Sequence, residues 1–573
     1  MKLFKKILII IAIGLVPIVA CDTDELVDLN VNPNSVTSEM DWRYFLSHSQ
    51  LKTMENRYVN WRTGLIFSSL LIQHYGGYNG TYSAGSGYLR GILDHQTSYW
   101  DYVYIAALKF AAEGMRQTTT DGYEPDWSNT HNACRIVYNM NMLYMTDYYG
   151  NVPYFGANRG IEGEAFFFPE YDSQQDIYTR EGINDGELRG GLLWELDDAA
   201  TKLASPGPDK LGTSDLWYGG NLGKWRKLAY SLMLREAMRI QEVDPVTSVK
   251  YINKAIAGGL MASSADNCIT QTATGASEWL NQNGYSRAMD PTDGSFQTSN
   301  RLSDTMIKFL KNNNDPRLMI ISGGVGPYDD CIAGTANCDK DPANQIGLPN
   351  GWDGGDDDPA VGPGKGIEWW CANVDAECAA KWDGVSDIVQ DEFFSGLNPL
   401  LIQDDDPYLH MGYAEVCFLL AEIAQRGIAS TPKSAAEHYA DGVTADMNRW
   451  VMYDASLTID PADITAYLTA HPLQAGEAGL EMIAWQHWLA TMMAPNHYES
   501  YATWRRTGRP TLTPTNYPNN HSGGRIFRKF VYSSADASLN EVNYKAGATL
   551  PNDEMTRMWW DMGYDGPGNQ TMP

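Results

Sequence analysis

The residues of this chain best suited to chemistry are aromatic rings set among amides and acids. The sequence contains 18 Trp, 33 Tyr and 15 Phe. A sugar presents an apolar C–H face that stacks on an aromatic ring, and its hydroxyls exchange hydrogen bonds with Asp, Asn and Arg side chains. Exposed rings on loops that also carry acids and amides therefore favour carbohydrate binding.

Two stretches and one further Trp have this composition. The first stretch, residues 75–88, is Gly-rich and lies between two expected helices, and its predicted ligand-binding residues are Tyr78, Asn79, Tyr82 and Tyr88. The second stretch, residues 347–370, contributes Trp352, Asp353, Trp369 and Trp370, and Trp279 precedes it in the same loop-rich region. Core packing or loop anchoring is the competing interpretation for each ring. Six other Trp lie in helical patterns and are predicted to be core residues: Trp61, Trp100, Trp194, Trp225, Trp485 and Trp488.

An acidic run in the second stretch is a candidate calcium site. Hard cations take several oxygen ligands from a short flexible loop, and this run supplies Asp353, Asp356, Asp357 and Asp358. The run lacks the order of acids found in an EF-hand, and a solvated acidic loop is the alternative. We predict no other cofactor.

Binding is favoured over catalysis by what the sequence lacks. It has no H-E-x-x-H, G-x-S-x-G or G-x-x-x-x-G-K-[ST] motif. A glycosidase carboxylate pair stays open as an alternative, because acids are abundant. The net charge of -29 argues against nucleic acid as a partner and against anionic polysaccharide. Neutral or cationic ligands are the expectation.

The N-terminal residues are typical of an exported lipoprotein. A basic head precedes the apolar run 7–19, which is too short to cross a bilayer as a helix. The run leads into Ala20 and Cys21, which predicts a signal peptide over residues 1–20 and a diacylglycerol on Cys21. An ordinary signal peptide with a nearby cysteine is the alternative.

Residues 21–37 are expected to form a lipidated tether. The tether opens with Asp22-Thr23-Asp24-Glu25, which resembles the surface-export signal of lipoproteins in the Bacteroidetes. The sequence has no second apolar stretch of membrane length, so we expect a protein anchored to a membrane rather than crossing it.

Seven cysteines besides Cys21 carry information about compartment and loops. Cys331 and Cys338 are seven residues apart in Gly/Asp/Pro-rich sequence, as are Cys371 and Cys378. In an exported protein, disulfides would stabilise such loops by about 2–4 kcal/mol each. A Cys331–Cys371 pairing is equally allowed, and a zinc site is disfavoured because no C-x2-C spacing or nearby His occurs. Cys134 and Cys417 are predicted to be buried thiols, whereas Cys268 has no assignment.

Helical periodicity dominates both ends of the chain. Ala414, Cys417, Phe418 and Ala421 fall at i, i+3, i+4 and i+7, which is one face of an amphipathic helix. Helices are expected at about 40–56, 61–75, 97–117, 131–147, 189–204, 228–240, 247–257, 301–312, 414–421, 434–450, 462–470 and 485–492. Residues 259–400 are rich in Gly, Asp, Asn and Pro, and their Trp content argues against disorder. We therefore predict an ordered, irregular region on a helical scaffold of residues 38–258 and 401–510.

Segments spread from end to end resemble the SusD/RagB family. They follow the family's order over nearly the whole mature chain, and they are residues 30–34, 146–154, 169–178, 225–235, 315–317, 413–422, 437–447, 504–510 and 559–561. Within them, Asp315-Pro316 reads as a helix stop, and Arg505 and Arg506 read as scaffold residues that satisfy a helix end.

The resemblance implies a mainly α fold, with about four tetratricopeptide-like helical hairpins carrying an irregular ligand-facing region in one domain of residues 38–573. It implies no catalysis, because family members bind nutrient at the cell surface as a lid on a SusC-like TonB-dependent barrel. We therefore expect a lipid-anchored outer-membrane protein that faces the cell exterior and passes oligo- or polysaccharide to such a transporter. A peptide-capturing RagB-type lid and, more remotely, a surface glycosidase are the alternatives, and the density of aromatic rings favours glycan.

Overall fold

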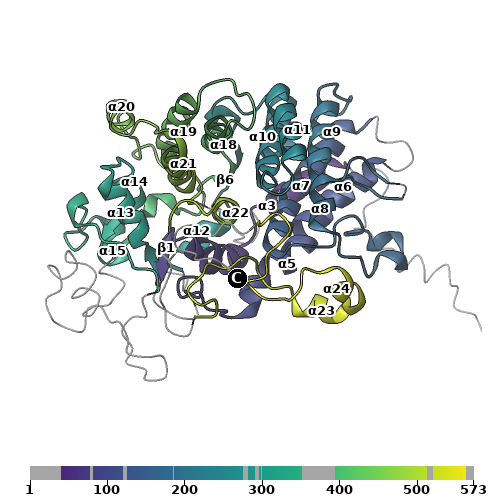
Figure 1. The fold of residues 1–573 in the computed structure, drawn as a ribbon, viewed down its shortest axis with the longest axis horizontal. Helices are drawn as coiled ribbons and strands as arrows, with labels where there is room; N and C mark the ends of the chain where they lie inside the picture. Colours follow the sequence, from purple (N-terminus) through teal and green to yellow (C-terminus); the bar gives the residue numbers. More distant parts are fainter. Residues whose placement is uncertain are drawn as a thin grey trace, which may run out of the picture. The chain divides into compact units, whose positions relative to one another are not determined.

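The computed structural model describes residues 41–77, 82–119, 126–184, 186–274, 282–290, 296–298, 300–351, 394–493, 495–512 and 520–562 (Figure 1). Contacts divide the chain into residues 1–42 and residues 43–573, and all helices and strands below belong to the second unit. The predicted signal peptide, Cys21 and the tether lie outside the described residues. No described helix is both long and apolar enough to cross a bilayer.

The described chain is mainly helical, as the sequence predicts. The N-terminal half contains α3 (Arg43–Thr53), α4 (Arg57–Val59), the π-helix η1 (Asn60–Ser69), α5 (Leu93–Val103), the π-helix η2 (Tyr104–Leu108), α6 (Lys109–Thr119), α7 (Ser128–Tyr149), α8 (Gln174–Thr179), α9 (Leu192–Leu203), α10 (Leu222–Arg239) and α11 (Pro245–Gly258). The C-terminal part contains α18 (Tyr413–Arg426), α19 (Ala435–Arg449), α20 (Pro461–Ala470), α21 (Gly476–Ala490), α22 (His497–Thr507), α23 (Ser534–Leu539) and α24 (Glu541–Gly547).

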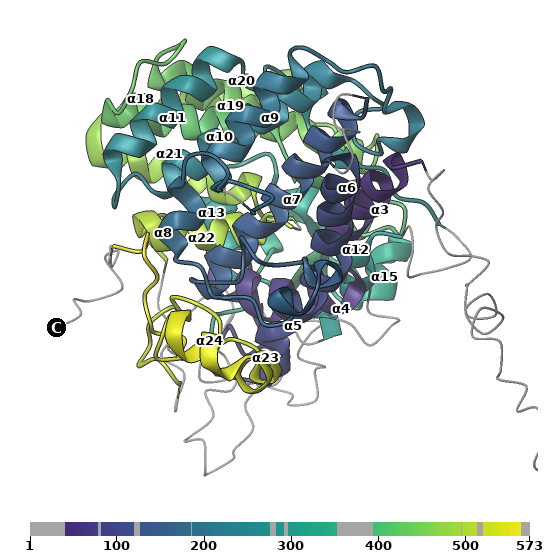
Figure 2. The same ribbon diagram turned by 90° about the vertical axis from the view of Figure 1, so that its right-hand side faces the viewer.

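Successive helices pack against each other as hairpins. The contacting pairs include α6 with α7, α9 with α10, α10 with α11, and α18 with α19. The α10 helix also contacts α18, so the two groups of hairpins adjoin (Figure 2). Local sequence sets their starts: Asn221 caps α10 by accepting from the Lys224 N–H, and Ser434 with Glu437 forms a capping box at α19. Every residue of α7 after Ser128 is buried, which makes it a central helix.

Buried ion pairs tie these helices together through the motif residues. Arg235 of α10 donates two hydrogen bonds to Glu415 of α18, at 2.6 and 2.7 Å. Arg506 of α22 binds Glu422 of α18 in the same bidentate way, at 2.7 Å for each bond. Bidentate guanidinium–carboxylate pairs fix both distance and orientation. The shared motifs therefore hold the scaffold together.

The two arginines near the end of α22 do more than the sequence predicts. Arg505 donates to the carbonyl oxygens of Asp147 and Arg528, at 2.7 and 2.8 Å, as well as to Tyr501 in its own helix at 3.3 Å. The expectation that Arg505 and Arg506 serve their own helix end was therefore incomplete, because most of their bonds reach other elements.

The predicted irregular region consists of short helices and strands. It contains β2 (Cys268–Thr270), α12 (Gly284–Met289), η9 (Phe296–Thr298), β3 (Asn300–Leu302), α13 (Asp304–Asn312), α14 (Leu318–Ile321), β4 (Ser322–Val325), α15 (Tyr328–Ala333) and β5 (Ser395–Leu397), with β1 (Tyr75–Gly77) and β6 (Tyr408–Met411) outside its bounds. The strands pair antiparallel as β1–β3, β2–β6 and β4–β5.

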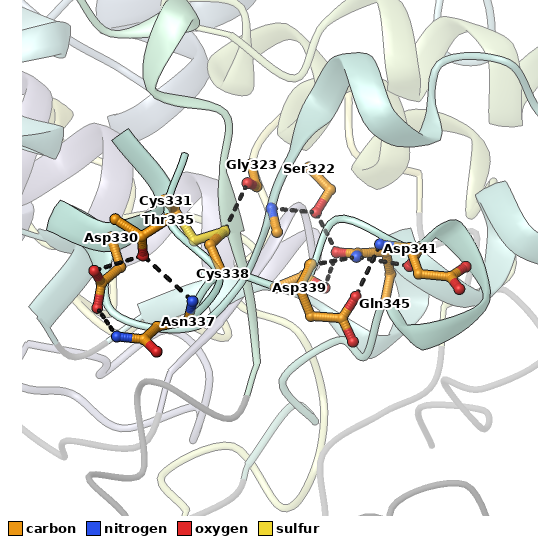
Figure 3. The surroundings of a disulfide bond; sticks show 12 residues. Ser322, Gly323, Asp330, Cys331, Thr335, Asn337, Cys338, Asp339, Asp341 and Gln345 are labelled. Atoms are coloured by element: carbon orange, nitrogen blue, oxygen red, sulfur yellow. Dashed lines mark hydrogen bonds between the residues drawn. A yellow bond between two sulfur atoms is a disulfide. The ribbon is translucent and has the colours of Figure 1, made fainter. Parts of the chain in front are cut away.

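A disulfide closes one loop of this region. Cys331 and Cys338 are bonded, which confirms one predicted pairing and shows the alternative Cys331–Cys371 pairing to be wrong (Figure 3). Asp330, just before the closed loop, accepts hydrogen bonds from Thr335 and Asn337 within it, at 2.7 and 3.1 Å (Figure 3).

The remaining cysteines divide between buried thiols and residues outside the description. Cys134 and Cys417 are buried thiols, as predicted, and Cys268, which had no assignment, is a third. Burial raises the pKa of the Cys134 thiol to about 12, so it is unreactive at neutral pH. Cys371 and Cys378 lie outside the described residues.

Candidate functional site

The described ends of the predicted ligand-facing stretches meet at the β1–β3 strand pair. Tyr75 pairs with Leu302, and Leu348 extends the arrangement by donating its N–H to the Leu302 carbonyl at 2.8 Å. Gly76 makes this approach possible, because a Cβ there would lie 2.3 Å from the Leu348 carbonyl oxygen. The close contact with the second stretch therefore requires a glycine at position 76 of the first.

Side chains reinforce this junction. Ser86 of the first stretch donates to Asn350 Oδ1 of the second at 2.7 Å, and accepts from the Gly351 N–H at 3.1 Å. Ser83 donates to Asn300 Oδ1 at 2.8 Å. The first and second aromatic stretches, which are more than 200 residues apart in sequence, are thus joined by hydrogen bonds between their described residues.

The other loop segments attach close by. The hydroxyls of Tyr75 and Tyr285 are 2.7 Å apart, which links β1 to α12 (Figure 1). The Ser395 N–H of β5 donates to the Ile346 carbonyl at 2.8 Å. Residues on both sides of 352–393 and the helix that follows Trp279 therefore lie around one small strand pair.

Tyr82 and Trp61 form an accessible aromatic pair beside this junction. Tyr82 is 41% exposed, and its ring centroid lies 5.4 Å from that of Trp61 at an interplanar angle of 32°. Trp61, the second residue of η1, is only partly buried, so its prediction as a core residue was wrong in part. Two adjacent, partly open rings offer the surface on which a sugar face can stack.

A histidine lies beside the pair, and the charges of Arg62 and Asp94 act on its ring. The His95 ring lies 5.5 Å from Trp61. Burial, together with the charge of Arg62, lowers the pKa of His95 to about 4, so the imidazole is neutral at physiological pH. Arg57 and Arg62 lie over the half-exposed ring of Tyr58, 5.7 and 5.3 Å from its centroid. These guanidiniums can donate hydrogen bonds to hydroxyl or amide oxygens of a ligand.

Tyr88 requires a correction. Its side chain is fully buried, so it packs in the core and does not face a ligand. Its backbone carbonyl accepts from the His521 N–H at 2.9 Å, which explains its position as a loop anchor. The remaining predicted ligand-binding residues lie outside the described residues, namely Tyr78, Asn79, Trp279, Trp352, Asp353, Trp369 and Trp370.

The other helical Trp residues divide between core and surface. Trp100, Trp225 and Trp488 are buried, as predicted, whereas Trp194 and Trp485 are partly exposed. Sequence reasoning missed Trp61 and Tyr58 as site residues, because helical periodicity does not say which side of a helix a neighbouring loop leaves open.

The predicted calcium ligands Asp353, Asp356, Asp357 and Asp358 also lie outside the described residues, so this site stays a prediction. Within the described residues, two groups bring three metal-ligating side chains together: Glu415–His487–Glu499 and His521–Asp553–Glu554. Each contains carboxylates already bound by guanidiniums, those of Arg235 and Arg239 in the first group and that of Arg90 in the second. Both groups are therefore ion-pair networks.

Comparisons with known proteins identify the family to which this fold belongs. The SusD-like family model, described as starch-binding and associating with the outer membrane, matches residues 33–351 and 371–533. No curated protein matches the chain.

Solved structures share the fold over most of its length. One named as a chitin-binding protein is 30% identical, covers 91% of this chain and 100% of its own, and gives a TM-score of 0.71. A chitin-binding SusD homolog from Flavobacterium johnsoniae is 19% identical, covers 91% of this chain and 99% of its own, and gives a TM-score of 0.67. A SusD homolog from Bacteroides vulgatus is 20% identical, covers 91% and 98%, and gives a TM-score of 0.67.

The match extends across the helical hairpins and the irregular region alike, and the fold is the tetratricopeptide-like helical fold of SusD-like structures. The chain belongs to the SusD-like family.

Proposed function

We propose that this protein is a cell-surface lipoprotein, anchored through Cys21, that captures oligo- or polysaccharide and delivers it to a SusC-like TonB-dependent transporter. The observation that carries the proposal is the partly exposed Trp61–Tyr82 pair beside the bases of the predicted aromatic loops. Family membership supports it, since the family is described as starch-binding and associating with the outer membrane.

The ligand class best supported is a neutral glycan, with chitin-type N-acetylglucosamine oligomers as the first to test. Two similar structures are named as chitin-binding, one of them 30% identical to this chain. The N-acetyl group adds a methyl, a donor and an acceptor to each sugar, which suits rings flanked by Arg and amide side chains. The proposal includes binding without turnover, in keeping with a family described by what it binds.

Titration calorimetry tests the ligand. Purified protein is titrated with chitohexaose, with cellohexaose (which has the same linkage without N-acetyl groups), with a maltooligosaccharide and with a mixed peptide digest. We expect saturable binding of a glycan and no new reducing ends after prolonged incubation. Binding of peptides alone would assign the protein to the RagB type, and new reducing ends would identify a glycosidase.

Substitution tests the site. Tyr82→Ala and Trp61→Ala should each weaken glycan binding by about 0.5–1.5 kcal/mol, the scale of one ring contact. Tyr44→Ala is the matched control, because Tyr44 is an exposed tyrosine on α3 and should leave affinity unchanged. Wild-type affinity in both site variants would place the site elsewhere.

Anchoring and partnership require separate measurements. Radioactive palmitate should label the wild-type chain and not Cys21→Ala expressed in a Bacteroidetes host. The tagged wild-type protein should co-purify an outer-membrane barrel from detergent extracts of the same host. An unlabelled wild-type chain would exclude the lipid anchor, and purification without any barrel would contradict the transporter partnership.

A further inference from the structure

A cavity adjoins the junction of the two stretches, with Gln73 and Asn350 among its lining residues. Its volume is about 710 Å³, within the range of about 300–1,000 Å³ typical of ligand pockets. The walls come from α13, α20 and α21, with Tyr439 of α19 and with Pro349 and Asn350 of the second stretch. Asn350 also binds Ser86 of the first stretch, so it borders both the cavity and the junction described above.

One wall of the cavity is a stacked aromatic pair. Phe309 of α13 and Trp485 of α21 have ring centroids 4.7 Å apart and an interplanar angle of 19°. Both side chains are only partly buried, although Trp485 sits in a helical apolar pattern. The buried ring of Trp488 packs edge-to-face against Trp485, with ring centroids 5.3 Å apart. The pair is therefore a fixed platform with accessible aromatic surface.

Gln486, next to Trp485 in the cavity wall, is held by two hydrogen bonds. Gln486 donates to the Tyr467 hydroxyl at 2.9 Å and accepts from buried Arg317 at 2.8 Å. Rigid walls preserve the shape of an empty site and so reduce the entropy lost on binding.

Charge in the cavity is balanced. Among the described residues that line it, Asp304 is the one carboxylate and Lys308 the one ammonium, and they bind each other at 2.8 Å. In a chain of net charge -29, this neutral surface neither attracts cations nor offers an anion a guanidinium.

The rim carries amides that are available to a ligand. Asn312 and Gln474 are exposed, and their side chains form no hydrogen bond with another described residue. Amides can donate to and accept from sugar hydroxyls at the same time. The combination of an open aromatic platform, neutral charge and unengaged amides is what a saccharide site requires.

We propose that the Phe309–Trp485 cavity is a second saccharide-binding subsite, which takes a short segment of neutral oligosaccharide independently of Trp61 and Tyr82. The inference rests on the proposed glycan-binding function and adds a second place at which the protein holds its ligand. Asn350 lines the cavity and also binds Ser86 of the first stretch, so the cavity adjoins the junction beside which Tyr82 lies.

The test is calorimetry with triacetylchitotriose on the purified full chain, with cellotriose as a second probe. Wild-type protein should bind two molecules per chain. Trp485→Ala and Tyr82→Ala should each retain one, and Trp485→Phe, which keeps a stacking ring, should restore the second with an affinity within about tenfold of wild type. Asn312→Trp provides a variant that fills the mouth of the cavity from an exposed position without removing a core contact, and it should also bind one molecule.

The outcomes separate this inference from the function itself. One molecule bound by wild type, lost in Tyr82→Ala and unchanged in Asn312→Trp, would overturn the second subsite and leave glycan binding intact. One molecule bound by wild type and lost only in Asn312→Trp and Trp485→Ala would make the cavity the sole site, which would overturn the proposal of a second subsite and exclude Trp61 and Tyr82 from the binding site. Failure of wild type to bind any saccharide would overturn both proposals.

Discussion

Glu55 is a carboxylic acid that the fold removes from water. It lies just before α4 and accepts a hydrogen bond from the Tyr498 hydroxyl at 2.8 Å. Burial raises the pKa of Glu55 to about 8, although the Tyr498 bond acts in the opposite direction. The side chain is therefore protonated at neutral pH in the folded protein and ionised in the unfolded chain.

This difference makes stability depend on pH. Between the unfolded pKa of about 4.5 and the folded pKa of about 8, unfolding releases a proton, so rising pH favours the unfolded state. Glu55→Gln keeps an acceptor for Tyr498 and removes the proton. Its stability relative to wild type should be about 3 kcal/mol more favourable at pH 8.5 than at pH 5.5, measured by urea unfolding. An equal difference at the two pH values would contradict the assigned protonation.

At the scale of single residues, the sequence predicted an aromatic site, but it did not predict correctly which rings form that site. Tyr82 is exposed as predicted, but Tyr88, six residues later in the same stretch, is fully buried. Trp61 was assigned to the core and instead pairs with Tyr82. Composition identifies a ring-rich loop, whereas the orientation of each ring depends on neighbours that are distant in sequence.

At the scale of elements, the buried Arg506–Glu422 pair joins α22 to α18. Removing Arg506 leaves Glu422 with only the more exposed Arg426 as its partner. Arg506→Ala should therefore lower the free energy of unfolding by more than Arg116→Ala, which removes a partly exposed partner of Glu113 within α6 and should cost about 1 kcal/mol or less. Equal losses in the two variants would show that burial does not set the strength of the pair.

The same pair should respond to acid. Burial acts to raise the pKa of Glu422, but the guanidiniums of Arg506 and Arg426 outweigh it and lower the pKa to about 2. The pair's contribution is complete above the unfolded pKa of about 4.5 and is lost as pH falls towards 2. The stability difference between wild type and Arg506→Met should therefore shrink between pH 5 and pH 2.5 in urea unfolding.

The disulfide should act locally. It closes a short loop that begins in the last turn of α15, and such a cross-link stabilises a folded protein by about 2–4 kcal/mol. In Cys331→Ser/Cys338→Ser, amide hydrogen exchange should accelerate in α15 and β4 and stay unchanged in α7. Faster exchange throughout the molecule would show that the bond supports the global fold.

Periodicity predicted many of the scaffold helices, because their apolar residues recur at helical spacing. The expected helix at 131–147 is α7 (Ser128–Tyr149), and that at 434–450 is α19 (Ala435–Arg449). In the sequence, α22 was indicated only by the motif at residues 504–510. Its composition is polar, so its apolar pattern does not show that most of its residues are buried. Strands of three or four residues carry no periodic signal, so the β1–β3 pair could not be foreseen.

At the scale of the whole molecule, charge distinguishes the ligand classes. The chain carries a net charge of -29, so a basic peptide would be attracted over long range and a neutral glycan would not. Affinity for chitohexaose should therefore change less than about twofold between 50 and 500 mM NaCl in calorimetry. Strong weakening by salt would indicate a cationic ligand and favour the peptide alternative.

The bond between Ser83 and Asn300 joins residues 217 positions apart, and its wider consequence concerns biogenesis. Helical hairpins form from near neighbours, whereas this junction requires closure of a very long loop, which is slow. A chain that emerges N-terminus first can build its first hairpins before the partners of β1 exist. The junction therefore requires the chain up to at least β3, and a chain arrested before residue 300 would contain the first helical hairpins without the β1–β3 strand pair.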